Sequence, residues 1–463
     1  MFFILCVGAF ACEGYLLAWR QTKTKQTRAK IMTSMHEILE GRSEIFDQLS
    51  RQFAVLQTTK TDGAFNGKVL QIGGNDVIDL TGMDCLALGS SPEAKQSLQR
   101  AIIEHDVSCP ASAVVTQMKE CAQAERALGQ WIFPEAKRPD SLLFFLGYDA
   151  NESFLYGIGV GLCGGILTAF RKDLKRLGAR SISTVFVQDR HLHYSGQAGI
   201  NRAVSECPKQ CFRYIYKDEG HLEDVLKKAR EEHGENALLV VATDSVLSTT
   251  GQSYNMELVI QTAARYDALL YVDEAHAGGA VGPQGRGVTS MAPSFDAEQR
   301  RIIIMETLGK APCLLGGFIA FADGSLKRLF EWMCPHRVFS ATPSPYLCKA
   351  ICDRVELLKS AWGDDRRAQL EEVVIYTKQL FTKGGFELLG NHHLRALWIK
   401  PETARQVREF LANEGYLVSI FEAPAVPRGK ALLRFGLRAD LTCQEILKFY
   451  QACYEARDNF NFC

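Results

Sequence analysis

A regular alternation of apolar strands and helical stretches between residues 139 and 322 constrains the fold more than any other feature. Its strand-like segments read SLLFFL, STVFV, FRYIY, ALLVVA, ALLYV, RIIIM and GGFIAF. Strands that are apolar on both faces are typical of a mostly parallel sheet that helices cover on both sides. The alternation therefore predicts an α/β domain built around such a sheet.

The chain is long enough for more than one domain, because its 463 residues are 47% apolar and 23% charged. Before the alternation, the text KVLQIGGNDVIDLTG reads as a small hairpin. After about Pro345, longer helices lead into alternating strands, which is typical of a smaller α+β domain. We expect an apolar run at 1–19, an N-terminal segment at 20–84, a large domain at 85–344 and a small C-terminal domain at 345–463.

The first nineteen residues, MFFILCVGAFACEGYLLAW, are mostly apolar and are followed by basic residues from Arg20 to Lys30. This length and flank predict a membrane anchor whose basic side, and with it the rest of the chain, faces the cytosol. Glu13 within the run is costly in hydrocarbon. A cleaved signal peptide would carry its positive charge before the apolar run. The alternative is an N-terminal helix that packs on a partner subunit.

Charge and cysteine content exclude two classes of partner. The chain has 53 basic and 53 acidic residues, so no global field attracts nucleic acid. Its fifteen cysteines show neither CxxC pairs nor the Cys/His spacing of metal sites, which fits reduced thiols in a cytosol-facing protein. We expect no nucleic-acid partner and no metal.

Polar side chains follow the ends of two predicted strands. ALLYV leads into Asp273-Glu274-Ala275-His276, and RIIIMET leads into Thr307-Leu308-Gly309-Lys310. In open α/β sheets ligands bind at the carboxyl ends of strands, so Asp273, His276 and Lys310 are expected over one pocket. A carboxylate near a lysine suits a pyridoxal phosphate enzyme. The lysine holds the cofactor as a Schiff base, and the acid keeps the pyridine nitrogen protonated.

Three other strand ends offer groups that suit such a cofactor. The segment 147–151 opens a helix whose backbone amides could hold a phosphate, although an ordinary turn looks the same. His193 could lie flat against an aromatic ring, although a histidine in such a place is more often a packing or capping residue. Ser248 could reach a phenolate oxygen.

Taken together, these segments resemble the α-oxoamine synthases, which condense an amino acid with an acyl-CoA and in most members release carbon dioxide. The text YVDEAHAGGAVGPQGRGV, followed by TLGKA and GGFIA, carries the resemblance, which extends over residues from about 70 to 450. It implies the fold-type I architecture of pyridoxal phosphate enzymes, with a mostly parallel seven-stranded sheet and a smaller α+β domain. It also implies a homodimer, or a heterodimer with a related subunit.

Residue by residue, the resemblance implies pyridoxal 5'-phosphate as cofactor, with Lys310 as the Schiff-base lysine and Asp273 beside the pyridine nitrogen. His276 would hydrogen-bond the phenolate with help from Ser248, and His193 would stack on the ring. The positions that it assigns to the cofactor phosphate are Tyr148 and Asp149, through their backbone amides, and Thr307. Arg434 would receive the substrate carboxylate, a task that suits a bidentate guanidinium.

Local text favours the serine palmitoyltransferase branch, which makes a 3-ketosphinganine-type product from serine and a long-chain acyl-CoA in the first step of sphingolipid synthesis. VFSATPSP and STTG resemble that branch, and a membrane anchor would fit a lipid enzyme of the endoplasmic reticulum. The alternatives are a synthase of the 8-amino-7-oxononanoate, aminolevulinate or 2-amino-3-oxobutyrate type, or a weakly active regulatory subunit. The segment 110–117 departs from the family text G-P-R-G-F-Y-G-T, because it lacks the arginine, the tyrosine and the glycines of that text.

Overall fold

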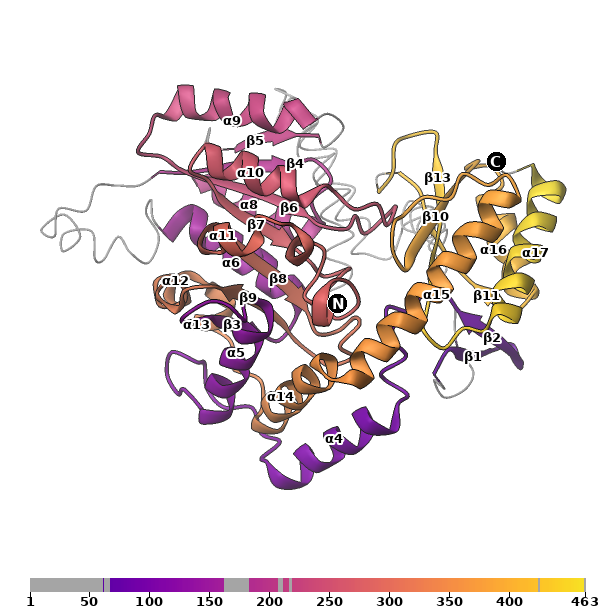
Figure 1. Ribbon diagram of the computed structural model, residues 1–463, viewed down its shortest axis with the longest axis horizontal. Coiled ribbons are helices and arrows are strands. Elements are labelled where there is room, and N and C mark those ends of the chain that lie inside the picture. Colours follow the sequence, from indigo (N-terminus) through magenta and orange to yellow (C-terminus); the bar gives the residue numbers. More distant parts are fainter. Residues whose placement is uncertain are drawn as a thin grey trace, which may run out of the picture. The chain divides into compact units, whose positions relative to one another are not determined.

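The apolar segments of the alternation pair into one sheet in the computed structural model, in the order β3-β9-β8-β7-β6-β4-β5 (Figure 1). These strands are β3 (Asp140–Phe144), β4 (Thr184–Asp189), β5 (Cys211–Tyr214), β6 (Leu238–Asp244), β7 (Leu269–Asp273), β8 (Ile302–Thr307) and β9 (Gly317–Phe321). Strands β5, β4, β6, β7 and β8 are parallel, whereas β9 is antiparallel to both β8 and β3. The prediction of a mostly parallel sheet is confirmed.

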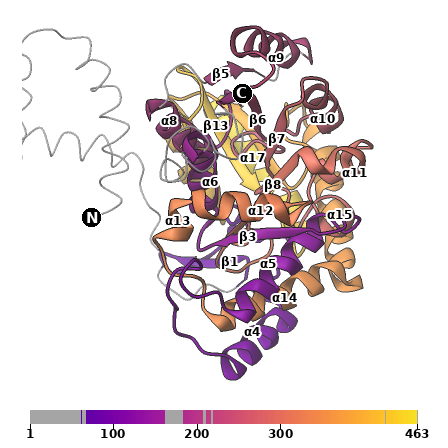
Figure 2. The ribbon, with the colours of Figure 1, turned by 90° about the vertical axis from the view of Figure 1, so that its left-hand side faces the viewer.

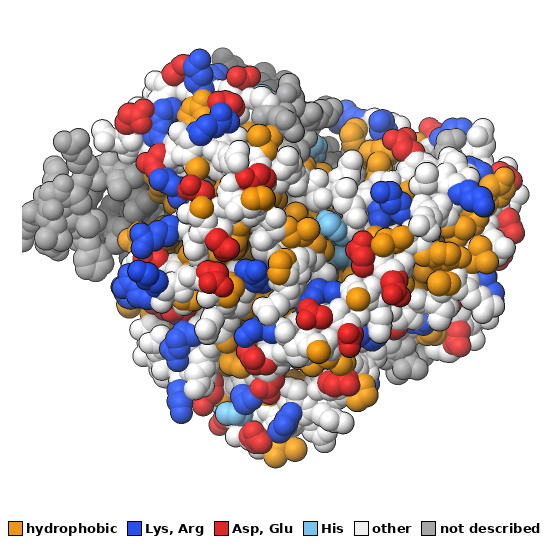
Figure 3. All heavy atoms as spheres, viewed as in Figure 1, with side chains coloured by type: hydrophobic (Ala, Val, Ile, Leu, Met, Phe, Trp, Pro, Cys, Tyr) orange, Lys and Arg blue, Asp and Glu red, His pale blue; other side chains and the backbone are white. Residues whose placement is uncertain are grey.

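The structure describes residues 61, 67–161, 183–206, 211–215, 219–423 and 425–461. The predicted membrane anchor at 1–19 lies outside these residues. Within the described ranges, no helix combines the length and apolarity that crossing a membrane requires. On the face drawn in Figure 3, acidic and basic side chains are interspersed rather than gathered by sign.

Helices cover both faces of the sheet because alternate residues of each buried strand point to opposite sides. Tyr271 packs on one side against Phe154 of α6, with ring centroids 5.5 Å apart. Leu270 and Val272 belong to the core on the other side. Figure 2 shows α6 and α8 on one side of the sheet and α10 and α11 on the other. The helices of this domain are α4 (Pro92–Glu104), α5 (Lys119–Ile132), α6 (Gly147–Gly161), α8 (Tyr194–Glu206), α9 (Glu219–His233), α10 (Met256–Arg265), α11 (Phe295–Glu298), α12 (Gly324–Phe330) and α13 (Pro335–Val338).

The C-terminal part forms a smaller α+β layer pair, as the sequence predicts. Its antiparallel sheet has the order β10-β13-β12. Phe435 of this sheet packs on Phe381 and Phe449, which come from two of the helices. Helix α14 (Pro345–Lys359) packs mainly against α4 and α5 of the large domain. The elements that follow it are α15 (Ala361–Lys383), β10 (Leu394–Ile399), α16 (Ala404–Asn413), β11 (Tyr416–Leu417), β12 (Ser419–Phe421), β13 (Ala431–Gly436) and α17 (Cys443–Phe460).

The N-terminal hairpin pairs with the small domain rather than standing before the large one. Strands β1 (Val69–Ile72) and β2 (Asn75–Asp79) form the hairpin, and β2 pairs in parallel with β11. Lys68 adds an ion pair of 2.7 Å to Glu445 of α17. The described part of segment 20–84 therefore belongs structurally with the C-terminal residues.

Candidate active site

A cavity of about 140 Å³ lies at the carboxyl ends of β6, β7 and β8, beside the first turn of α6. Its walls include six of the residues predicted from the sequence, namely Tyr148, His193, Asp273, His276, Thr307 and Lys310. Asp149, Ser248 and Arg434 are not among the lining residues. Most of the predicted cofactor residues are thus brought together by the topology of the sheet.

Asp273 is fixed as a hydrogen-bond acceptor at the end of β7. Its Oδ2 accepts a bond of 2.7 Å from Asn151 Nδ2, and its Oδ1 accepts one of 2.9 Å from the Ala275 backbone N–H. Asn151 is itself held by the Tyr271 hydroxyl, which donates to Oδ1 at 2.6 Å. The carboxylate is therefore oriented by two neighbouring residues and is almost fully buried.

Lys310 lies in the turn after β8, where burial lowers the pKa of its amine to about 8. The carboxyl groups of Asp273 and Asp244 oppose this shift, and the charge of Arg434 adds to it. A lysine with such a pKa is uncharged in a substantial fraction of molecules near neutral pH. Its amine can therefore act as a nucleophile or as a base.

Two histidines line the cavity as neutral imidazoles. Burial, reinforced by the charges of Lys310 and Arg434, holds the pKa of His276 well below its usual range. Within the described residues, His276 Nδ1 is buried without a hydrogen-bond partner. Burial also lowers the pKa of His193, whose Nδ1 lies 2.7 Å from the Ser195 hydroxyl. The orphaned nitrogen of His276 is a place for a ligand atom.

The first turn of α6 approaches the end of β8 so closely that only a glycine fits at its start. A Cβ atom at Gly147 would lie 2.8 Å from both Cβ and Oγ1 of Thr307. The first amides of a helix have no partner within it, so this turn can hold an anion. The amine, the oriented carboxylate, the orphaned imidazole and this helix start together fit pyridoxal phosphate.

Ser248 and Arg434 meet at the edge of the site. Arg434 of β13 donates a hydrogen bond of 2.5 Å to the backbone carbonyl of Ser248. Its guanidinium also lies 4.6 Å from the ring centroid of Phe421. Burial lowers the pKa of Arg434 to about 10, so the group stays charged at neutral pH. The serine contributes its carbonyl here, whereas the sequence predicts a role for its hydroxyl.

Among the other residues that line the cavity, three with polar side chains were not predicted as site residues: Asn151, Ser195 and Asp244. Asp244 ends β6 and accepts a bond of 3.1 Å from the His193 backbone N–H. Burial, with the charge of Asp273 as a second cause, raises its pKa well above the ordinary value. The strand-end rule that found Asp273 could have found Asp244. Asn151 lies one helical turn into α6, where sequence alone gives no direction for its side chain.

No cluster of His, Cys, Asp and Glu within the described ranges is arranged to hold a metal.

Comparisons with known proteins agree with this geometry. The model of the family "Aminotransferase class I and II" matches residues 200–452. The 8-amino-7-oxononanoate synthase of Herminiimonas arsenicoxydans is 26% identical over 415 residues, which cover 88% of this chain and 96% of the relative. The 2-amino-3-ketobutyrate coenzyme A ligase of Escherichia coli K12 is 26% identical over 427 residues, covering 89% and 97%.

Solved structures of related enzymes share the fold. Serine palmitoyltransferase of Sphingomonas wittichii superposes with a TM-score of 0.75 at 19% identity, covering 91% of this chain and 98% of that one. A further serine palmitoyltransferase structure with the same TM-score was solved with the cofactor. The homologues are α-oxoamine synthases. This chain therefore belongs to the aminotransferase class I and II family, has the fold-type I architecture and uses pyridoxal phosphate as its cofactor.

Proposed function

We propose that this protein is an α-oxoamine synthase that joins an amino acid to an acyl-CoA, a reaction that in most members of the family releases carbon dioxide. The observation that carries the proposal is the pairing of Lys310 and Asp273 over one cavity. The amine of Lys310 has a pKa of about 8, and Asn151 orients the carboxylate of Asp273. Relatives that are similar over most of this chain and carry the names of such synthases support it.

Each residue has a defined task in this proposal. Bound pyridoxal phosphate supplies an electron sink for the negative charge that develops at the substrate Cα. Lys310 Nζ holds the cofactor aldehyde and can accept the Cα proton. Asp273 holds a proton at the pyridine nitrogen. His276 offers its unpartnered Nδ1 to the phenolate oxygen, and His193 packs against the ring.

The phosphate and the substrate carboxylate occupy opposite sides of the site in this proposal. The phosphate is held by the amides of Tyr148 and Asp149 at the start of α6 and by the Thr307 hydroxyl. The carboxylate is received by Arg434, which is charged at neutral pH and whose Nη1 already bonds Ser248. A hydroxyl contact from Ser248 to the phenolate stays a prediction.

For the substrates, the named relatives favour a synthase of the 8-amino-7-oxononanoate or 2-amino-3-ketobutyrate type. The serine palmitoyltransferase type is the second candidate, and the likeness of fold to those structures supports it. The two candidates differ in the length of the acyl chain that they require. We also propose that residues 1–19 anchor the protein to a membrane, at the endoplasmic reticulum if sphingolipid synthesis is its role. Fractionation with and without these residues tests the anchor.

A substrate panel tests the reaction. Purified protein loaded with cofactor is incubated with glycine, alanine or serine and with acyl-CoAs from acetyl to palmitoyl. Release of free CoA is followed, and products are identified by mass spectrometry. The expected result is an α-amino ketone from at least one pair. Lys310→Ala is expected to lose both the product and the visible colour of the lysine-bound cofactor. Lys359→Ala, at a half-exposed lysine of α14 that pairs with Glu356, is expected to keep both.

Two outcomes would contradict the proposal in different ways. A coloured wild-type protein that releases no CoA from any pair would favour a regulatory subunit, in line with the altered segment 110–117. That segment contributes backbone to a contact with the segment between α13 and α14, because Thr342 Oγ1 donates to the Ala111 carbonyl at 3.1 Å. A colourless wild-type protein would remove the cofactor assignment itself.

A further inference from the structure

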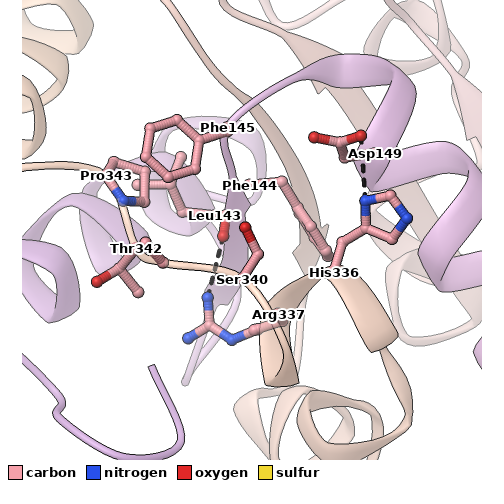
Figure 4. Close-up of a pocket in the computed structure, with 10 residues that line it drawn as sticks. Leu143, Phe144, Phe145, Asp149, His336, Arg337, Ser340, Thr342 and Pro343 are labelled. Atoms are coloured by element: carbon pink, nitrogen blue, oxygen red, sulfur yellow. Dashed lines mark hydrogen bonds and ion pairs between the residues drawn. The ribbon is translucent and has the colours of Figure 1, made fainter. Parts of the chain in front are cut away.

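A histidine beside the start of α6 lies between two carboxylates, and Figure 4 shows its contact with one of them, Asp149. His336 of α13 has its Nδ1 3.1 Å from Asp149 Oδ1 and its Nε2 3.2 Å from Glu152 Oε2. Its backbone N–H also donates to Ser153 Oγ at 3.1 Å. Both ring nitrogens lie within ion-pair distance of a carboxylate oxygen, an arrangement that favours the doubly protonated ring, an imidazolium ion. These two ion pairs raise the pKa of His336 to about 9.

The charges around this ring balance. On α6 it faces Asp149 and Glu152, and Glu152 is also paired with Arg202 of α8 at 2.9 Å. The next residue of α13, Arg337, is engaged elsewhere, with Glu125 at 2.6 Å and Glu331 at 2.9 Å. Two carboxylates are thus matched by the imidazolium and by Arg202. Without the proton on His336, one negative charge would be left over.

The ion pair between His336 and Asp149 lies at the first turn of α6, which also borders the cofactor cavity. Gly147 and Tyr148 line the cofactor cavity, and Asp149 is the next residue of α6. The Asp149 carboxylate contacts His336 (Figure 4), and Asp149 is not among the residues that line the cofactor cavity. A carboxylate in the first turn of a helix stabilises that helix, but it repels a phosphate bound at the same helix start. The site therefore needs a cation to cancel the charge of Asp149.

We infer that His336 is a positioning residue for the cofactor phosphate: its imidazolium ion neutralises Asp149 and holds the first turns of α6 where their amides bind an anion. The inference rests on the proposed phosphate site. It implies that affinity for phosphorylated ligands depends on the charge of His336, whereas affinity for the same ring without a phosphate does not.

The test measures equilibrium binding of pyridoxal phosphate and of pyridoxal to the apo protein at pH 7.5. His336→Gln keeps a polar side chain and removes the charge. It is expected to weaken binding of pyridoxal phosphate about tenfold, the effect of one uncompensated charge a few ångströms from a phosphate. Binding of pyridoxal is expected to stay within twofold. The double variant His336→Gln/Asp149→Asn is expected to recover most of the loss, and His105→Gln, whose ring pairs with Glu120, serves as the control.

The pH dependence gives a second readout. Phosphate-dependent affinity of the wild type is expected to fall as pH rises through about 9, and His336→Gln is expected to lack this step. Unchanged binding in His336→Gln, or an equal loss for both ligands, would overturn the inference. If His336→Gln does not fold, the Asp149→Asn variant tests the inference instead. Tenfold weaker binding of pyridoxal phosphate by Asp149→Asn would contradict the inference. A wild type that prefers pyridoxal phosphate but makes no product would leave this inference intact and remove only the proposed reaction.

Discussion

At the scale of single residues, two buried carboxyl groups beneath the site differ in their partners. Glu274 accepts hydrogen bonds from the Ser245 hydroxyl at 2.6 Å and from the backbone N–H groups of Val288 and Thr289. Glu306 is equally buried, yet within the described residues neither of its oxygens has a partner. Burial, then the charge of Glu274, raises the pKa of Glu306 well above its usual range. Glu306 therefore keeps its proton to a higher pH in the folded protein than in the unfolded chain.

Replacing Glu306 by glutamine is expected to stabilise the protein at pH 8 by about 1–2 kcal/mol. The unfolded chain loses the Glu306 proton above a pH of about 4.5, whereas the folded chain keeps it. The wild type thus loses stability as pH rises from the unfolded pKa toward the raised folded one. Glutamine removes this dependence. Thermal unfolding of both proteins at pH 5 and pH 8 measures this pH dependence of stability. A Glu306→Gln variant less stable than the wild type at pH 8 would refute the prediction. Glu274→Gln, which disturbs satisfied hydrogen bonds, is expected to destabilise at both pH values.

Lys310 gives a prediction about rate. Only its neutral amine captures the cofactor aldehyde, so colour formation on the apo protein should accelerate with pH and level off with a midpoint near 8. Arg434→Gln should move the midpoint upward, because the charge of Arg434 lowers the pKa of Lys310. Stopped-flow absorbance across pH 6–10 is the measurement. A midpoint near the ordinary lysine value of about 10.4 would contradict the prediction.

A site residue can be predicted from the sequence when its role follows from its position in a strand or helix, and not when the role depends on a distant partner. Asp273 and Lys310 follow from the rule that ligands bind at the carboxyl ends of parallel strands. Asn151 and His336 follow from no such rule, because their roles depend on partners 122 and 187 residues away in the chain. The resemblance to a family placed Arg434 near the site, but it could not show that Arg434 contacts the Ser248 carbonyl.

At the scale of elements, the loop after β6 connects the strand ends of the large domain to the smaller sheet. The Asn391 backbone N–H donates to the Gly251 carbonyl at 3.0 Å. A Cβ atom at Gly251 would lie 2.0 Å from the carbonyl oxygen of Leu394, the first residue of β10. Ser248 in the same loop accepts the bond from Arg434. This loop therefore sets the distance between Arg434 and the cofactor cavity.

Gly251→Ala is expected to destabilise the protein by about 3 kcal/mol or more, because it adds a steric clash to an unfavourable backbone angle. The matched control is Gly234→Ala. Both glycines have a positive φ, +70° and +74°, but nothing lies within 4 Å of a Cβ at Gly234. The control should cost only about 1 kcal/mol, the price of the backbone angle alone. Chemical denaturation measures both, and equal losses would show that the contact with β10 has no energetic role.

At the scale of the whole molecule, the large sheet and the N-terminal hairpin were predictable, but the pairing of that hairpin with β11 was not. Continuous apolar segments such as ALLVVA and ALLYV predict buried parallel strands. The partner of the hairpin is β11, which has two residues, Tyr416 and Leu417. Tyr416 pairs with Ile78, more than 300 residues earlier in the chain. A strand of two residues is too short for its pattern to indicate a partner so distant in the chain.

Exposed apolar side chains lie where two segments that are distant in the sequence, 106–115 and 339–346, contact each other. The Tyr346 backbone N–H donates to the Asp106 carbonyl at 3.2 Å, and Thr342 contacts Ala111. Around these contacts Val107, Val115 and Phe339 are exposed, the last two by 74% and 78%. Apolar side chains concentrated in this way are typical of a surface that another chain covers.

We expect the protein to form a dimer through this surface, as enzymes of its fold commonly do. Phe339→Asp should shift the sedimentation coefficient from that of a dimer toward that of a monomer, because a charge would be buried in the interface. Ile375→Asp, at an exposed apolar position of α15 in the small domain, is the control and should remain dimeric. Analytical ultracentrifugation at micromolar concentration distinguishes the two. If Phe339→Asp sediments as the wild-type dimer does, the association uses another surface. A monomeric wild type would refute the expected dimer.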